Sequence, residues 1–210
     1  MFYCVHKGKQ TGIYSTWNEC KEQTQGFPNP IFKKFENRED AEFFLKNGFT
    51  NNQQVITIPK GYYTAYTDGS FKKTKDGPKC GYGVYFGKDD SRNISRPFTY
   101  ENPTNNRAEL LAILACLNVI TKEGRPYVIL TDSKYSYDSL TRFAVKWEQN
   151  DWRTVDCNMV KNKEFIKPIY DILKQHPNIK LQHLNSHTGF NDIYSKGNSE
   201  ADKLANNGCK

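Results

Sequence analysis

The first 48 residues alternate short apolar runs with turn residues, in the pattern of a small sheet. The pattern predicts, in order, two strands within 2–14, a helix over 17–25, a strand over 30–35 and a helix over 38–47. Thr16 and Glu19 have the spacing of a capping box at the start of the first helix, and Gly48 ends the second. We therefore expect a three-stranded sheet with two helices packed on it.

Residues 49–61 do not continue this pattern. Their first half is polar and they close on Pro59 and Gly61, which predicts a linker. The chain would then consist of a first domain over 1–48 and a second domain over 62–210.

From Tyr62 onward, strand-like runs come first and then alternate with helical runs. Strands are predicted at 62–67, 80–87, 93–100, 127–132 and 179–185, and helices at 106–120, 133–150, 163–175 and 197–207. The first three strands, separated by turns, are typical of an antiparallel meander, whereas the later strands alternate with helices as parallel strands do. The pattern indicates an α/β domain whose mixed sheet is covered by helices.

Composition narrows the class of protein. The chain is 37% hydrophobic and 14% aromatic, so a packed core is expected and general disorder is excluded. The formal net charge of +7 suits a polyanionic partner such as nucleic acid. The six cysteines are scattered without a C-x-x-C pair, which favours reduced thiols. No apolar run approaches the roughly 20 residues of a membrane span, so we expect a soluble intracellular protein, cytoplasmic or nuclear, without a membrane partner.

Four acidic residues occupy positions where catalytic sites are common. Asp68 and Asp132 each end an apolar strand, and Glu109 and Asp202 lie early in predicted helices. Taken singly, each has a plainer explanation, as a turn residue, a helix cap, a first-turn acid or a surface charge. Gathered in one cleft, such acids would raise one another's pKa values and require a divalent cation. Oxygen ligands without cysteine favour Mg²⁺ or Mn²⁺ over zinc.

Four segments of the second domain resemble the signature segments of ribonuclease H: YTDGS at 66–70, TNNRAEL at 104–110, TDSKY at 131–135 and HTGF…GNSEADKLA within 187–205. The first domain, through TWNEC and IFKKF, resembles the small hybrid-binding domain that precedes the type-one enzyme in eukaryotes and some other genomes. The resemblance covers nearly the whole chain. It implies a ribonuclease H-like mixed five-stranded sheet with helices on both faces, preceded by a small α+β module with a three-stranded sheet and two helices.

The resemblance also implies a metal-dependent endoribonuclease. Its catalytic acids match the ligands of two Mg²⁺ ions, for which Mn²⁺ substitutes: Asp68, Glu109, Asp132 and Asp202. The implied reaction is hydrolysis of the RNA strand of RNA–DNA hybrids to 5′-phosphate and 3′-hydroxyl ends, as in the removal of RNA primers or transcription hybrids. His187 matches the family's mobile histidine, which assists proton transfer or product departure.

Further residues match substrate contacts of the family. The matching residues are Thr104, Asn105, Asn106, Asn162, Trp147 and Trp152 in the second domain, and Tyr3, Trp17, Phe32, Lys33 and Lys34 in the first. Thr104 and Asn105 are also explained as helix caps, and Trp17 and Phe32 as core residues. The stretch 146–154 matches a basic protrusion, although two acids there offset its two basic residues. The resemblance implies a monomer that binds RNA–DNA hybrids and, through its first domain, binds double-stranded RNA more weakly.

Two other functions stay open on the sequence alone. A nuclease of the same fold that acts on DNA, such as an integrase, a transposase or a Holliday-junction enzyme, shares the strand-end acids but not the TNNRAEL segment or the first domain. A non-enzymatic binding protein would use the first domain for recruitment. That function would leave the four acids and His187 without a role.

Overall fold

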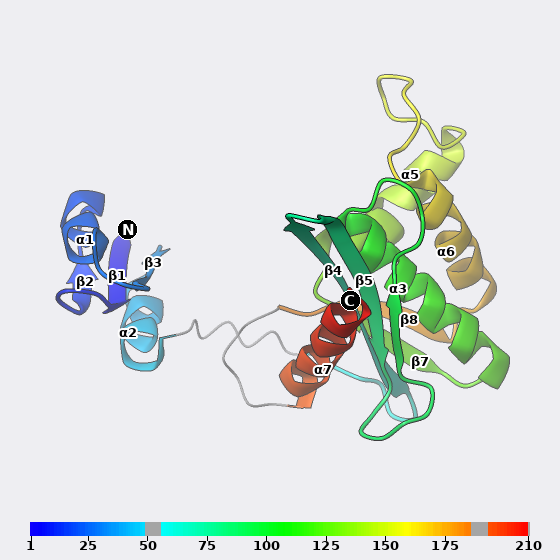
Figure 1. Cartoon of the computed structure of the whole chain (residues 1–210), viewed down its shortest axis with the longest axis horizontal. Helices are drawn as coiled ribbons and strands as arrows, with labels where there is room; N and C mark the ends of the chain where they lie inside the picture. The colour runs from blue at the N-terminus through cyan, green and yellow to red at the C-terminus, as the bar shows by residue number, and fades with distance from the viewer. Residues whose placement is uncertain (49–55, 186–192, 210) are drawn as a thin grey trace. The chain divides into compact units, whose positions relative to one another are not determined.

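The computed structural model describes residues 1–48, 56–185 and 193–209, which form two compact units (Figure 1). Unit 1 is residues 1–48, and unit 2 is the rest of the described chain. Unit 1 contains the predicted elements: β1 (Phe2–Lys7), β2 (Gly12–Tyr14), α1 (Trp17–Thr24), β3 (Ile31–Phe35) and α2 (Arg38–Asn47). The strands form an antiparallel sheet in the order β2-β1-β3, which confirms the predicted small module.

Helix caps and a small apolar core stabilise unit 1. The Thr16 hydroxyl accepts a hydrogen bond from the Glu19 N–H (3.3 Å), and the Glu19 carboxylate accepts one from the Thr16 N–H (2.8 Å). This pair confirms the predicted capping box. Gly48 ends α2 with a φ of 76°, a conformation that glycine adopts without strain. The core consists of Cys4, Phe35, Ala41 and Phe44.

Unit 2 is built on a five-stranded sheet. Its elements are β4 (Tyr63–Thr74), β5 (Gly77–Tyr85), β6 (Ile94–Pro97), α3 (Asn105–Ile120), a 3₁₀ turn (Thr121–Glu123), β7 (Tyr127–Thr131), α4 (Lys134–Asp138), a π-helical turn (Ser139–Phe143), α5 (Ala144–Gln149), α6 (Lys163–Gln175), β8 (Ile179–His183) and α7 (Ile193–Gly208). The strand order is β6-β5-β4-β7-β8. Strands β4, β5 and β6 are antiparallel neighbours, and β7 and β8 run parallel to β4, which confirms the mixed sheet.

Helices cover both faces of this sheet (Figure 1). The backbone of α3, at Ala108 and Glu109, passes so close to Gly69 of β4 that a side chain at this position would not fit. Gly83 of β5 lies against the backbone of α7, and it pairs with Asp68 across the strands. Because successive residues of a strand point to opposite faces, α3 and α7 lie on opposite sides of the sheet.

Two apolar clusters fill the space between the sheet and its helices. The cluster that includes residues of α3 and α6 is the larger and includes Leu110, Ile113, Leu117, Ile129 and Ile166, all fully buried. The cluster that includes residues of α7 is smaller and consists of Tyr66, Val128, Leu130, Leu184 and Ala201. Ile56 and Ile58, which belong to the stretch predicted as a linker, pack against this smaller cluster.

Several bounds differ from the sequence prediction. Strand β4 continues to Thr74, past its predicted end at Thr67, so Asp68 lies within the strand and does not end it. Strand β6 ends at Pro97, before its predicted end at Tyr100.

The predicted helix over 133–150 is interrupted by the π-helical turn, where the hydroxyl of Thr141 donates to the carbonyl of Tyr137 (2.7 Å) beside the main-chain ladder. Helix α7 begins at Ile193, before the predicted start at Gly197. Asp202 therefore lies in the middle of the last helix, not early in it. All six cysteines are free, as expected, and no helix in the described ranges has the length and apolar character needed to cross a membrane.

Candidate active site

Three acids meet where β7 ends beside the longer strand β4. The parallel register pairs Thr67 with Thr131, so Asp68 and Asp132 follow at neighbouring positions on the two strands. Glu109 reaches the same place from α3, because Gly69 lets the helix backbone approach β4. One carboxylate oxygen from each of the three acids lies within 4.8 Å of the other two. The structure thus brings together three of the four predicted metal ligands.

The electrostatics of this cluster favour a bound cation. Asp68 is 6% exposed and Glu109 is 4% exposed. Burial, together with the charges of Asp132 and Asp202, raises the pKa of Asp68 to about 7. Burial, together with Asp68 and Asp132, also raises the pKa of Glu109 well above its ordinary value. Oε2 of Glu109 is buried and has no hydrogen-bond partner among the described residues. A divalent cation would neutralise the crowded charge and use this free oxygen, so the residues present fit one.

Polar groups from three elements orient the cluster. The N–H of Gly69 donates to Oδ1 of Asp68 (2.8 Å), and the amide of Asn105 donates to Oε1 of Glu109 (3.4 Å). Nδ2 of Asn198, on α7, donates to Oδ2 of Asp132 (3.0 Å). Sequence reasoning missed Asn198, although it stands one helical turn before Asp202. That spacing on one helix was the available signal.

Asp202 is held by a separate hydrogen-bond chain. It lies outside the group of three acids, but its charge contributes to the raised pKa of Asp68. Nδ2 of Asn206 donates to Oδ1 of Asp202 (2.8 Å), and the hydroxyl of Ser70 donates to Oδ1 of Asn206 (2.9 Å). Strand β4 therefore supports the fourth acid through Asn206. His187, the predicted mobile histidine, lies outside the described residues.

The residues predicted to contact substrate at the start of α3 are accessible. Thr104 is exposed and caps the helix, its hydroxyl accepting from the N–H of Arg107 (3.3 Å). Asn105 is exposed and Asn106 is partly buried. Capping and substrate contact are compatible for Thr104, because the cap occupies only part of the hydroxyl's hydrogen-bonding capacity.

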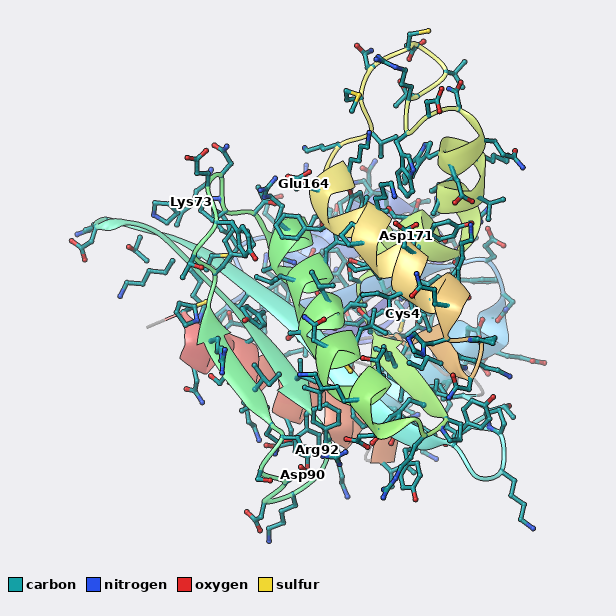
Figure 2. All side chains as sticks on the ribbon, turned by 90° about the vertical axis from the view of Figure 1, so that its right-hand side faces the viewer. Cys4, Lys73, Asp90, Arg92, Glu164 and Asp171 are labelled. Carbon is teal, nitrogen blue, oxygen red and sulfur yellow. The ribbon has the colours of Figure 1, made fainter. Side chains whose placement is uncertain are left out.

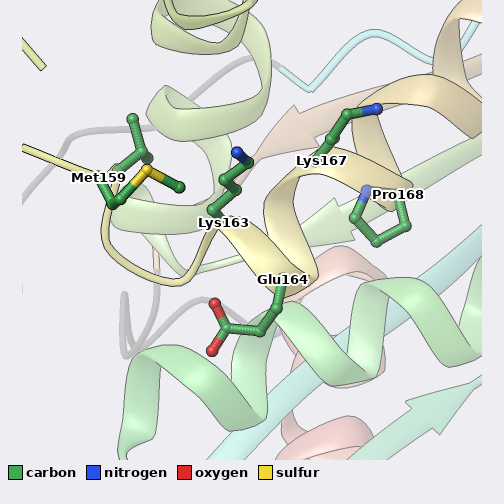
Figure 3. A pocket seen from close by; sticks show the side chains of 6 residues that line it. Met159, Lys163, Glu164, Lys167 and Pro168 are labelled. Atoms are coloured by element: carbon green, nitrogen blue, oxygen red, sulfur yellow. The ribbon is translucent and has the colours of Figure 1, made fainter. Parts of the chain in front are cut away.

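Asn162 immediately precedes α6 and has a left-handed conformation with a φ of 61°. Its side chain is 5% exposed, and Nδ2 donates to the hydroxyl of Tyr135 (2.8 Å). A cavity of about 410 Å³ lies beside it (Figure 3), lined by Met159, Val160, Lys163, Glu164, Lys167 and Pro168. Glu164 offsets part of the positive charge of this lining, and the ammonium of Lys167 is paired with Asp171 (2.7 Å), which leaves Lys163 as the lysine available for a phosphate contact.

The two tryptophans of the predicted protrusion differ in their surroundings. Trp147 is partly buried and its ring lies 5.7 Å from that of Phe143. Trp152 is only 5% exposed and packs in the core, with its ring 6.0 Å from that of Tyr170. Trp152 can therefore serve a substrate mainly by supporting the loop that follows α5, since little of its own surface is available for contact.

Unit 1 presents a row of aromatic rings. Trp17 lies between Tyr3 and Phe32, with ring centroids 5.9 Å apart in both pairs. Trp17 is 45% exposed and Phe32 is 39% exposed, so both reach the surface. The ammonium of Lys34 lies 5.8 Å from the centre of the Tyr3 ring. Lys33, which precedes Lys34 in β3, points to the other face of the sheet by strand alternation.

The five-stranded mixed sheet of unit 2 carries a group of three acids that could hold a metal ion, two of them buried. A family model described as RNase H matches residues 60–210, and a model described as the Ribonuclease H1 N-terminal domain matches residues 1–45. The chain belongs to the ribonuclease H family. As a member it is an endoribonuclease that hydrolyses RNA in RNA–DNA hybrids.

Individual relatives agree with this assignment. Ribonuclease H of Schizosaccharomyces pombe is 30% identical, over 99% of this chain and 97% of that protein. Ribonuclease H1 of Homo sapiens is 27% identical, over 100% of this chain and 90% of that protein. The solution structure of the PFV RNase H domain is 29% identical, with a TM-score of 0.61 over 71% of this chain and 96% of that domain. The first two similarities extend through both units.

Proposed function

We propose that the chain cuts the RNA strand through two divalent ions, Mg²⁺ with Mn²⁺ as a substitute, and leaves 5′-phosphate and 3′-hydroxyl ends. Its proposed ligands are Asp68, Glu109, Asp132 and Asp202. The observation that carries the proposal is the group of three acids within 4.8 Å, two of them buried and with raised pKa values. When bound, such ions lower the pKa of a water molecule and neutralise charge on the leaving oxygen.

The chain's own residues contribute orientation. The N–H of Gly69 fixes one oxygen of Asp68, and the amide of Asn198 fixes one oxygen of Asp132. Both carboxylates are therefore held in place before substrate arrives, which lowers the cost of assembling the site. His187 is proposed to move a proton at the leaving group or to assist product departure, on the basis of its sequence context.

Substrate recognition is proposed to involve both units. In unit 2, Asn105 and Asn106 would contact the sugars of the RNA strand, and Thr104 and Asn162 a phosphate of the DNA strand. In unit 1, the exposed ring of Trp17 with Tyr3 and Phe32 offers stacking surface, and Lys34 beside Tyr3 offers positive charge, the two features of nucleic-acid-binding surfaces. Lys33 is proposed to add positive charge from the opposite face of the sheet. The bound duplex is proposed to be an RNA–DNA hybrid, or double-stranded RNA with lower affinity.

The proposed domain boundaries are 1–48 and 62–210, with a linker at 49–61 whose last part, from Ile56, packs on unit 2. A linked second binding unit raises the effective concentration of duplex at the active site without adding catalytic groups. The proposed cellular substrates are RNA primers or transcription hybrids, and the proposed active form is a monomer.

A cleavage assay tests the proposed function. The purified chain is incubated with Mg²⁺, Mn²⁺ or a chelator on a labelled RNA–DNA hybrid, beside matched RNA and DNA duplexes. We expect the RNA strand of the hybrid alone to be cut, only with metal, and to yield 3′-hydroxyl ends that a polymerase extends. The Asp132→Asn variant should bind the hybrid and not cut it. Cleavage of the DNA duplex would indicate a different nuclease, and binding without cleavage would indicate a recruitment protein.

A further inference from the structure

The hairpin of β4 and β5 extends beyond the rest of the sheet. Strand β7 pairs with β4 only as far as Thr67, and β6 pairs with β5 only from Gly81 onward. Past these points the two strands pair only with each other, through Lys72↔Lys79, Lys73↔Pro78 and Thr74↔Gly77. We call residues 72–79 the lysine arm.

The arm carries an excess of positive charge. It contains four lysines and a single acid, Asp76, in the sequence KKTKDGPK. The lysines are all exposed: Lys72, Lys73, Lys75 and Lys79. Throughout the described ranges, none of their ammonium groups forms an ion pair. Lys73 is labelled in Figure 2, at the opposite end of the sheet from Asp90 and Arg92.

This arrangement is unfavourable for the isolated protein. Lys72 and Lys79 stand directly opposite each other across the two strands, and like charges in that position destabilise a hairpin. A two-stranded hairpin without a further strand is also marginal in water. A polyanion that binds between the two ammonium groups would remove the repulsion. The arm therefore has the charge and geometry of a phosphate-binding element.

The arm also lies within reach of a duplex at the active site. Asp68 stands on the same strand, so Lys72 lies roughly 13 Å and Thr74, the last residue of β4, roughly 20 Å further along it, at about 3.3 Å per residue. These distances correspond to roughly four to six base pairs of duplex at about 3.4 Å each. Lys73, like Phe71 and Cys80, faces the side of the sheet on which α3 begins, since the Sγ of Cys80 contacts the carbonyl of Thr104.

We propose that the lysine arm binds the phosphate backbone of the duplex whose RNA strand is cut at the acid cluster, about half a helical turn from the cut. The inference rests on the proposed function, and it adds a contact that the stretch 146–154 is poorly suited to make. That stretch has two basic and two acidic residues, so its net charge is zero. The arm supplies the electrostatic attraction in its place.

The test compares two double variants that remove the same charge. Lys72→Gln/Lys79→Gln changes the arm, whereas Lys88→Gln/Lys122→Gln changes two exposed lysines near the other end of the sheet. Both are made in the full chain carrying Asp132→Asn, so that binding of a hybrid of about 18 base pairs is measured with Mg²⁺ and without cutting. Affinity is recorded at several salt concentrations, and cleavage and thermal stability are recorded in the otherwise unchanged chain.

We expect the arm variant to bind the hybrid roughly 5- to 30-fold more weakly near 0.1 M salt. The slope of its log affinity against log salt concentration should be smaller by about one to two, because fewer counterions are released on binding. Turnover at saturating hybrid should be unchanged, and the melting temperature should stay equal or rise because the repulsion is gone. Equal affinities and salt slopes for the two double variants would overturn the inference. If the unchanged chain neither binds nor cuts the hybrid, it is the proposed function that fails.

Discussion

Nδ2 of Asn198 lies 3.0 Å from Oδ2 of Asp132, so the last helix of unit 2 fixes the acid that follows β7. Asn198 is 7% exposed, and its Oδ1 is buried without a hydrogen-bond partner among the described residues. A buried amide whose oxygen has no hydrogen-bond partner lowers the stability of the fold. The amide of Asn198 is nevertheless oriented so that its nitrogen donates to Asp132 in the acid cluster. The contact between Asn198 and Asp132 therefore positions the carboxylate of Asp132 at some cost to the stability of the fold.

Asn198→Ala is expected to lower Mg²⁺ affinity or turnover by roughly 10- to 100-fold, because residues that orient metal ligands have effects of that size. The fold should be retained, since the substitution also removes the unpaired oxygen. Metal titration followed by calorimetry, beside the cleavage rate, measures both effects. Asn207→Ala, at an exposed position of the same helix, is the control. Equal metal affinity and equal turnover for the two variants would exclude a positioning role for Asn198.

Ser70 is connected to Asp202 through Asn206, because the hydroxyl of Ser70 donates to the Asn206 amide, which in turn donates to the acid. Ser70→Ala and Asn206→Ala should therefore have non-additive effects on Mg²⁺ affinity. We expect the double variant to resemble Asn206→Ala alone, with a loss of roughly 3- to 10-fold, rather than the product of the two single losses. A double-mutant cycle on metal affinity measures the coupling. Strictly additive losses would show that the two side chains act independently.

The apolar pattern of the sequence was sufficient for the sheet, its mixed topology and the two-helix module. Strand-like runs separated by turn residues indicate that consecutive strands pair with one another. The continuous apolar run at 127–130 indicates a buried parallel strand. The pattern could not locate the π-helical turn after Asp138, where the hydroxyl of Thr141 also donates to the carbonyl of Tyr137. It also missed the first residues of α7, because Ile193 is 69% exposed there and adds nothing to an apolar stripe.

Asp132 directly follows the buried strand β7, as the sequence predicted, whereas Asp68 lies within β4, which continues to Thr74. The close approach of α3 at Gly69, which brings Glu109 to both acids, depends on tertiary packing. The amides that support the acids could not be identified from the sequence. Asn198 and Asn206 belong to no apolar pattern, and their role follows only from their hydrogen bonds to Asp132 and Asp202 in the folded chain. The burial of Trp152 also depends on tertiary packing against α6, which no local pattern contains.

The metal-free protein should lose stability as pH rises toward neutrality. The folded state raises the pKa of Asp68 from 3.8 to about 7, so between these values the folded chain binds more protons than the unfolded chain. The stabilising proton is fully bound at low pH and is lost as pH rises through the folded pKa, which lowers the free energy of unfolding. We expect Asp68→Asn to be more stable than the unchanged chain at pH 8 in chelator, by on the order of 2 kcal/mol.

The measurement for this pH dependence is denaturant unfolding at pH 5 and pH 8, with chelator and with Mg²⁺. Mg²⁺ should stabilise the unchanged chain more at pH 8 than at pH 5, and should stabilise Asp68→Asn little at either pH. If Asp68→Asn and the unchanged chain respond equally to pH in chelator, the acid cluster does not carry the charge repulsion described.

Trp17→Ala should weaken hybrid binding by roughly 5- to 100-fold, because a stacked base contributes about 1–3 kcal/mol, and Trp17 is 45% exposed between Tyr3 and Phe32. The apparent substrate constant should rise while turnover at saturating hybrid stays nearly unchanged, since the ring belongs to unit 1 and the acids to unit 2. Tyr63→Ala, an exposed aromatic at the start of β4, is the matched control and should leave both constants near their original values. Removal of residues 1–48 should have the same kind of effect as Trp17→Ala, and larger. A loss of turnover equal to the loss of affinity would contradict a binding role for unit 1.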